Sequence, residues 1–255
     1  PLSRLPNLTL VKDPDFSVVV PLFNEADNIA LLQEELSSAL SGRNYELILV
    51  DDGSTDGTVS RIQCDATVRV LQFRKNSGQS AAMLAGMRAA KGQAVVLLDG
   101  DLQNDPKDIP KLLAEIERGA DLVCGYRLRR KDTLLKKLSS RIANFVRSRF
   151  VGDGVRDTGC TLKAMRRVCV KALVPFKGVH RFIPALVKNA GFTIVEIPVN
   201  HRPRQFGLSK YGLGNRAIRA TVDMFGVRWL QSRRLNLAFE EHSDVEIVEP
   251  LHFSR

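Results

Sequence analysis

Apolar, β-branched runs bounded by turn residues recur along the first half of the chain and predict β-strands. These runs are Ser17 to Phe23, Glu46 to Asp52, Val68 to Phe73, Ala94 to Asp99 and Asp121 to Gly125. Three segments between them repeat apolar residues at the period of a helix: Asp27 to Leu40, Gln79 to Lys91 and Pro106 to Arg118. This alternation predicts an α/β fold, a parallel sheet with helices on both faces.

Polar residues gather where three of these predicted strands end. In chain order they are Asn24, Glu25, Asp51, Asp52, Asp99 and Asp101. Ligands of such sheets bind at the carboxyl ends of the strands, so we expect these side chains to meet on one rim.

The second half has a different pattern. Residues 133–150 and 213–230 place apolar side chains about one helical turn apart with Lys and Arg between them, and a strand is predicted at Thr193 to Val199. In the second segment the apolar face comprises Ile218, Val222, Phe225 and Trp229. Two basic amphipathic helices are consistent with docking on an anionic membrane surface. The alternative is that their apolar faces pack on the core.

The charge is divided along the 255 residues. Residues 121–234 carry 25 Lys and Arg against 6 Asp and Glu, whereas residues 1–120 carry 12 against 17. The second half is therefore expected to face something anionic. Nucleic acid is disfavoured as that partner, because only 6% of the residues are aromatic and no recognisable DNA or RNA module is present.

The four cysteines form no CxxC pair and have no histidine at zinc-ligand spacing, so reduced thiols in a cytosolic protein are expected rather than a structural metal. No apolar run approaches the roughly 18 to 20 residues that span a bilayer, and the first ten residues lack the apolar core of a signal peptide. We therefore expect a chain that is soluble or lies on a membrane surface.

The stretch LLDGDLQND places Asp99 and Asp101 two residues apart after an apolar strand. Such carboxylates can chelate Mg²⁺ or Mn²⁺, whose remaining ligands are often phosphate oxygens, so this pair predicts a nucleotide diphosphate site with Gln103 as a neutral oxygen ligand. The alternative is a simple Asp-Gly turn. The stretch DDGSTDGT could likewise be a turn with a helix cap, or its Asp52 could bind a nucleobase or ribose.

Two basic groups could clamp phosphates: Arg127 to Lys131, and the loop HRPRQFGLSKYG with Arg202, Arg204 and Lys210. Solvated charge runs are the alternative. The G-x-G-x-x-A match in YGLGNRA is rejected as a dinucleotide fingerprint, because it follows a basic loop late in the chain rather than a first strand.

Together, SVVVPLFNEADNI, ILVDDGSTDGT, KNSGQSAAMLAGMRAAKG and VVLLDGDLQNDP resemble the family 2 glycosyltransferases of GT-A fold. The later DTGCTLKAMRR, RFIPALV and VEIPVNHRPRQFGLSKY are similar to the polyprenyl-phosphate branch, which includes dolichol-phosphate mannose synthase and undecaprenyl-phosphate sugar transferases. The resemblance implies one GT-A domain over residues 1–235, with a donor-binding half at about 15–125 and an acceptor- and membrane-facing half at about 126–235. Residues 236–255 would form an acidic tail.

The resemblance also implies a role for individual residues. The nucleotide-sugar donor would be bound by Pro21, Phe23, Glu25, Asp52, Asp99 and Arg127, and a Mg²⁺ or Mn²⁺ ion by Asp101 and Gln103. The residues implied in catalysis are Asp101, Asp157, Arg204 and Lys210. Lys163 departs from the pattern, because relatives often have arginine there.

The reaction implied is metal-dependent, inverting transfer of a sugar from a UDP- or GDP-sugar to undecaprenyl or dolichyl phosphate, with UDP favoured. It would take place at the cytoplasmic membrane face, where a peripheral chain could also need a membrane-anchoring partner protein. The alternative is transfer to a hydroxyl of a glycan or another acceptor, although the processive signature Q-x-x-R-W is absent because Phe225 stands where Gln is required.

Overall fold

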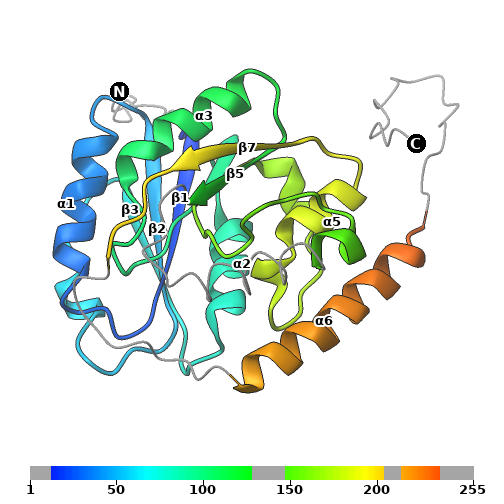
Figure 1. The fold of residues 1–255 in the computed structure, drawn as a ribbon. Helices are drawn as coiled ribbons and strands as arrows, with labels where there is room; N and C mark the ends of the chain where they lie inside the picture. The colour runs from blue at the N-terminus through cyan, green and yellow to red at the C-terminus, as the bar shows by residue number, and fades with distance from the viewer. Residues whose placement is uncertain (1–12, 128–146, 204–213, 236–255) are drawn as a thin grey trace, which may run out of the picture.

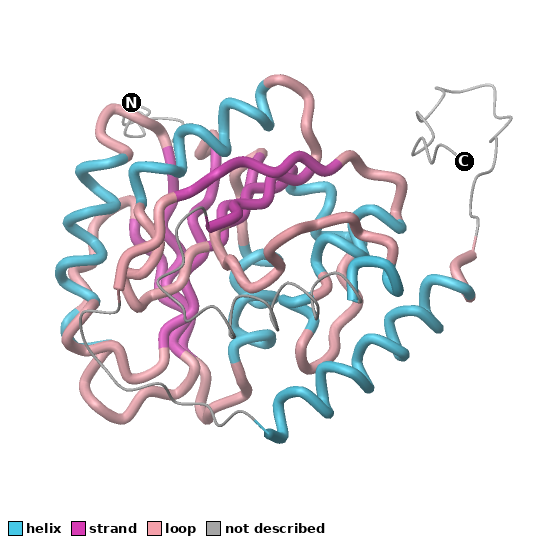
Figure 2. Tube along the Cα trace, in the orientation of Figure 1, coloured by secondary structure: helices cyan, strands magenta, loops and turns pink. Residues whose placement is uncertain are grey.

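The computed structural model describes residues 13–127, 147–203 and 214–235. Its centre is a twisted sheet of seven strands with helices on both sides (Figures 1 and 2). The strands are β1 (Phe16–Leu22), β2 (Tyr45–Asp51), β3 (Val68–Gln72), β4 (Ala94–Leu97), β5 (Leu122–Arg127), β6 (Lys163–Arg166) and β7 (Ile194–Val199). The α-helices are α1 (Ile29–Ala39), α2 (Gln79–Ala89), α3 (Ile109–Glu117), α5 (Ile183–Asn189) and α6 (Gly214–Ser232).

The strand order is β3-β2-β1-β4-β6-β5-β7. Strands β1 to β4 pair in parallel, and so do β5 and β7. Strand β6 runs antiparallel to both of its neighbours. The α/β architecture and the six strands expected from the apolar runs are confirmed, with ends that shift by one or two residues.

Strand β6 was not expected. Its four residues, KAMR, are too short and too basic to stand out as an apolar run. It lies inside the sheet, where it pairs with β4 and β5 and buries Ala164 and Met165 completely, one on each face.

The two faces of the sheet bury separate apolar layers. On one face Val19 and Ile48 pack with α2 and α5, and on the other Val18 and Leu47 pack with α1 and α3. The alternation along β1 and β2 assigns successive side chains to opposite faces, as expected for central strands buried on both sides.

Helix α6 lies along the outside of the domain (Figure 1). It attaches through Val227, which is 1% exposed, while Val222, Phe225 and Trp229 are 64%, 57% and 61% exposed. The alternative that this apolar face packs on the core is therefore wrong for these three residues.

Most of the helix expected over 133–150 lies outside the described residues. Its described end is helical, over 147–151. Residues 236–255, the expected acidic tail, also lie outside the described residues. In the described part of the chain, no helix is long and apolar enough to cross a bilayer.

Candidate active site

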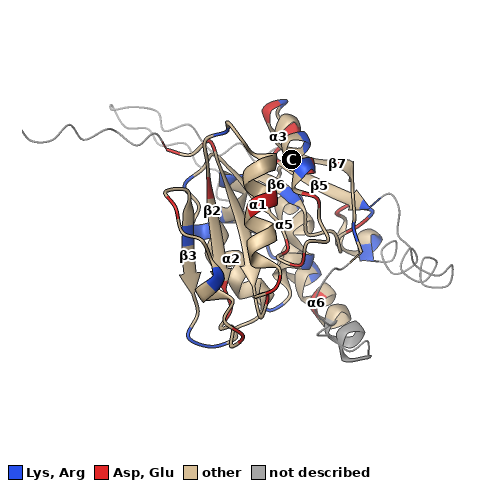
Figure 3. Cartoon of the chain, turned by 90° about the vertical axis from the view of Figure 1, so that its left-hand side faces the viewer, with Lys and Arg blue, Asp and Glu red and all other residues tan. Residues whose placement is uncertain are grey.

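The carboxyl ends of β1, β2 and β4 meet at one edge of the sheet, because these three strands are neighbours and run in parallel. The backbone N–H of Asp52 donates to the carbonyl of Leu22 at 2.8 Å, which joins the ends of β2 and β1. The close approach of Gly100 to these strand ends depends on its lack of a side chain, because a Cβ there would lie only 2.7 Å from Leu22 Cδ2. The three strand ends that carry the predicted acidic residues thus lie at a single edge of the sheet. Figure 3 colours the acidic residues of the described chain red and the basic residues blue.

The loop after β1 carries Phe23, Asn24 and Glu25 and is held by the loop after β2. Asn24 adopts a left-handed φ of 52°. Its N–H donates to Ser54 Oγ at 2.9 Å, and its Oδ1 accepts from the N–H of Thr55 at 2.9 Å. The side chains of DDGSTDGT therefore shape the loop that presents Glu25, a structural task that their turn-like composition does not reveal.

Asp52 is buried and its carboxylate accepts two backbone N–H groups. Ser77 donates to Oδ1 at 2.7 Å and Gly78 donates to Oδ2 at 2.8 Å, directly before α2 begins at Gln79. Gly53 permits this approach, since its φ is +75° and a Cβ there would lie 2.8 Å from the backbone of Asn76. Asp52 thus fixes the start of α2 against the rim.

Asp99 follows β4 and is held by two side chains from different elements. Gln79 Nε2 donates to Oδ1 at 2.9 Å and Thr161 Oγ1 donates to Oδ2 at 2.5 Å. The pKa of Asp99 is raised to about 6, mainly by burial and also by the charge of Asp101, while Thr161, Lys163 and Gln79 act in the opposite direction. Both oxygens of Asp99 are therefore engaged before any ligand binds.

Asp101 and Gln103 provide oxygen atoms suited to a divalent cation. Asp101 is partly exposed, and its Oδ1 accepts the N–H of Gln103 at 3.2 Å. The Nε2 of Gln103 points to the carbonyl of Arg202 at 3.5 Å, and within the described residues its Oε1 accepts no hydrogen bond. A carboxylate beside an amide oxygen fits the ligand preference of Mg²⁺ and Mn²⁺. Leu102 between them has φ 60° and is buried, which turns the two polar side chains outward from a fixed apolar anchor.

The basic loop after β7 starts at this same place. Arg202 pairs with Glu35 at 2.7 Å and with Asp105 at 2.8 Å, and its N–H donates to the carbonyl of Gln103. The hypothesis that Arg202 clamps phosphate is thus replaced by an anchoring role, because two carboxylates already neutralise it. Arg204 and Lys210 lie outside the described residues.

Arg127, at the end of β5, forms a two-pronged ion pair with Asp157. The distances are 2.7 Å from Nε to Oδ2 and 2.8 Å from Nη2 to Oδ1. The segment that begins at Asp157 continues to Thr161, which binds Asp99. This segment therefore connects the Arg127 and Asp157 pair to the acidic rim.

Sequence reasoning assigned no role to Gln79 or Thr161, although both lie in stretches that carry the family resemblance, and it noted Lys163 only as a departure from the family pattern. Gln79 and Thr161 hold Asp99, and Lys163 lies in the sheet at 2% exposure with its Nζ donating to the carbonyl of Cys160. For Lys163, a lysine between apolar neighbours is a further signal in the sequence. It places a buried positive charge behind Asp99.

An open α/β sheet with acidic residues at its carboxyl edge is an architecture on which nucleotides are commonly bound. The family model described as "Glycosyl transferase family 2" matches residues 17–174. This match covers more than half of the chain, which therefore belongs to glycosyltransferase family 2.

The chain is similar to curated members of this family whose names specify a polyprenyl phosphate. The chain is 40% identical over 228 residues to dodecaprenyl-phosphate galacturonate synthase of Rhizobium johnstonii, covering 85% of this chain and 67% of the relative. It is 37% identical over 204 residues to undecaprenyl-phosphate 4-deoxy-4-formamido-L-arabinose transferase of Yersinia enterocolitica, covering 77% and 62%. The corresponding Pseudomonas fluorescens transferase is 38% identical over 202 residues, with 76% and 59% covered. The chain thus spans about three fifths to two thirds of these relatives.

Solved structures share the fold. Glucosyl-3-phosphoglycerate synthase from Mycobacterium tuberculosis, in complex with Mn²⁺, UDP and glucosyl-3-phosphoglycerate, superposes with a TM-score of 0.64 at 19% identity, covering 92% of this chain and 86% of that one. A complex of the same enzyme with Mg²⁺ and UDP gives 0.63 at 23% identity, covering 84% and 80%. The GT-A fold expected from the sequence is confirmed.

Proposed function

We propose that the protein transfers a sugar from a nucleotide-sugar, with UDP favoured, to a polyprenyl phosphate at the cytoplasmic face of a membrane. The observation that carries the proposal is the similarity, at 36% identity or more, to transferases whose names specify a polyprenyl phosphate. The rim supports it, since Asp99, Asp101 and Gln103 gather on one edge of the sheet.

The donor would lie along this rim. Pro21, Phe23 and Glu25 at the end of β1 would face the base and ribose, with Asp52 holding the start of α2 beside them. Asp101 and Gln103 would hold Mg²⁺ or Mn²⁺, which supplies positive charge to the departing nucleotide diphosphate. The mycobacterial enzyme of the same fold was crystallised with UDP and either metal.

The kind of acceptor determines whether the enzyme needs a general base. A phosphate monoester has a second pKa near 6, so its oxygen is already a nucleophile at neutral pH and needs orientation more than deprotonation. Asp157, the acidic candidate, has both oxygens engaged by Arg127. A neutral hydroxyl acceptor would require a general base, whereas Asp157 already serves to hold Arg127, which is consistent with a phosphate acceptor.

In this proposal Arg204 and Lys210 would neutralise the phosphates of donor and acceptor, whereas Arg127, whose charge Asp157 already neutralises, would orient the donor. Asp157 would keep the Arg127 guanidinium in place beside the sugar. Attack in line with the departing diphosphate would invert the anomeric carbon.

Helix α6 would bring the domain to the lipid. Val222, Phe225 and Trp229 form an exposed apolar face, and Phe225 meets Phe150 edge to face with ring centroids 5.0 Å apart. The two basic amphipathic segments therefore touch at these rings. Apolar side chains with arginines around them are typical of helices that lie in the interface of anionic bilayers.

A transfer assay tests the proposal. Purified protein would be supplied with Mn²⁺, a panel of UDP- and GDP-sugars labelled in the sugar, and a short polyprenyl phosphate in detergent. We expect one donor to label the lipid extracted into chloroform, and the free polyprenol to remain unlabelled. Equal labelling of the free alcohol would favour the hydroxyl-acceptor alternative, and a donor that binds without any lipid labelling would overturn the acceptor assignment.

A further inference from the structure

A cavity lies at the opposite end of the sheet from the acidic rim. Its volume is about 510 Å³. It is bounded by the last turn of α2, by Gln93 directly before β4, and by Arg166 at the end of β6 with the short 3-10 helix η3 (Arg167–Ala172) that follows. Because Ala94 at the start of β4 pairs with Arg166, this is the amino-terminal edge of β4, whereas Asp99 follows its carboxyl end.

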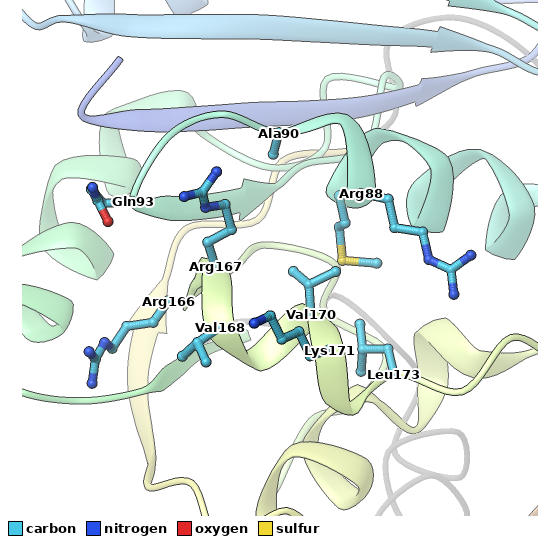
Figure 4. A pocket seen from close by; sticks show the side chains of 10 residues that line it. Arg88, Ala90, Gln93, Arg166, Arg167, Val168, Val170, Lys171 and Leu173 are labelled. Atoms are coloured by element: carbon cyan, nitrogen blue, oxygen red, sulfur yellow. The ribbon is translucent and has the colours of Figure 1, made fainter. Parts of the chain in front are cut away.

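The cavity combines an apolar floor with a basic rim. Met87, Ala90, Val170 and Leu173 are all less than 9% exposed and form the floor with the partly buried Val168. The rim carries four cationic side chains, Arg88, Arg166, Arg167 and Lys171. Figure 4 shows Arg166 and Arg88 on opposite sides of the cavity, with Arg167 and Lys171 between them.

Most of this positive charge is not neutralised locally. Arg166 pairs with Asp121 at 3.1 Å. Within the described residues, no carboxylate lies within ion-pair distance of Arg88, Arg167 or Lys171. The lining itself includes no acidic residue. Arg88, Arg167 and Lys171 are exposed to solvent, so their positive charge is open to a bound anion.

We propose that this cavity binds a small organic phosphate, with its phosphate group on Arg167 and Lys171 and its uncharged part on the apolar floor. The volume falls in the range of small-molecule sites, roughly 300 to 1,000 Å³. Guanidinium and ammonium groups together recognise a phosphate dianion through charge-assisted hydrogen bonds. The partly buried Val168, above the buried floor, offers apolar contact that inorganic phosphate cannot use, which favours an organic ligand. The site is separate from the donor rim and does not depend on the proposed transfer reaction.

Methyl NMR of the full chain tests this site directly. Phenyl phosphate is the probe, inorganic phosphate is the comparison, and the methyl groups of Val168, Val170 and Leu173 are the reporters. We expect saturable shifts of these methyl signals with phenyl phosphate, and at least fivefold weaker binding of inorganic phosphate.

The double variant Arg167→Gln with Lys171→Gln is expected to weaken phenyl phosphate binding at the reporters at least tenfold. Arg88 and Arg166 stay unchanged, because Arg88 lies in the last turn of α2 and Arg166 pairs with Asp121. The matched control removes the same charge elsewhere, with Arg43→Gln and Arg118→Gln, and should bind within twofold of the wild type. Reporter signals that do not shift, or equal weakening in both double variants, would overturn the proposal. Equal affinity for the two phosphates would overturn the role of the apolar floor.

Discussion

The guanidinium of Arg127 and the carboxylate of Asp157 are joined by two parallel hydrogen bonds, 2.7 Å from Nε to Oδ2 and 2.8 Å from Nη2 to Oδ1. The two side chains are only 15% and 11% exposed. The backbone N–H of Arg127 adds a third, longer bond to Oδ2 at 3.3 Å. Such a fork orients both groups at once, so the pair functions as one unit.

Substitutions of this pair should therefore be strongly non-additive. Either Arg127→Ala or Asp157→Ala leaves a largely buried charge without its partner and should destabilise the fold by about 3 kcal/mol and lower turnover at least 100-fold. The double variant should lose far less than the sum of the two. Urea unfolding and transfer kinetics across the four proteins measure this coupling, and additive losses would show that the two residues act independently. Arg127→Lys, which keeps the charge but not the fork, should recover little activity.

Asp101→Asn should reduce turnover at least 100-fold and weaken Mn²⁺ binding, because the proposed metal site would lose its charged ligand. Gln103→Ala should have a smaller effect, about tenfold, since it removes a neutral oxygen. Mn²⁺ titration followed by electron paramagnetic resonance separates metal affinity from turnover. Asp27→Asn, an exposed carboxylate paired with Arg61 on the surface, is the matched control and should leave both quantities near wild type. Unchanged turnover of Asp101→Asn at saturating Mn²⁺ would refute the assignment.

Asp99 should make stability depend on pH. Its pKa is raised to about 6 by burial and the nearby Asp101, above the value of about 3.9 in the unfolded chain. Between these values the folded protein holds a proton that the unfolded chain has released, so the contribution of Asp99 to stability falls as pH rises through this window and stays low above pH 6. In the presence of EDTA, Asp99→Asn should therefore gain stability relative to wild type between pH 5 and pH 7.5, by about 1 to 2 kcal/mol. Urea unfolding at both pH values measures this, and a difference that does not change with pH would contradict the shifted pKa.

The regular strands were predictable because each is a continuous apolar run of a length that suits a sheet buried on both faces. Strand β6 was not, since Lys163 and Arg166 at its ends mask a core of only two apolar residues. Its position depends on pairing with β4 and β5, which are distant in the sequence. The apolar periodicity of α6 was visible, but whether that face meets core or solvent depends on tertiary placement that periodicity does not encode.

The acidic rim was predictable for a similar reason, because strand direction alone brings the ends of β1, β2 and β4 together. The residues that hold the side chains of the rim in place were not predictable. Asp99 is held by Gln79 and Thr161, residues without a distinctive spacing, and Arg202 differs from a phosphate clamp only through its contacts with Glu35 and Asp105. Composition identifies a cation, whereas its ion-pair partners determine whether it is available for a ligand.

Charged substitutions on the exposed face of α6 should abolish membrane binding without affecting the fold. Phe225→Glu and Trp229→Glu place a carboxylate at positions that are 57% and 61% exposed, so little core packing is lost. At an anionic bilayer each would both remove buried apolar area and add repulsion. We expect sedimentation with phosphatidylglycerol vesicles to fall at least tenfold for each variant.

Val174→Glu is the matched control, because Val174 is an exposed apolar residue, at 44%, that lies off this helix. It carries the same change in charge and should sediment like wild type. Turnover on a polyprenyl phosphate presented in vesicles should fall for the α6 variants, whereas turnover on a short, detergent-dispersed acceptor should stay within about twofold of wild type. This contrast separates docking from chemistry, since a variant that damaged the donor rim would lose activity with both acceptors. Equal sedimentation of all three variants would place the membrane-binding surface elsewhere on the domain.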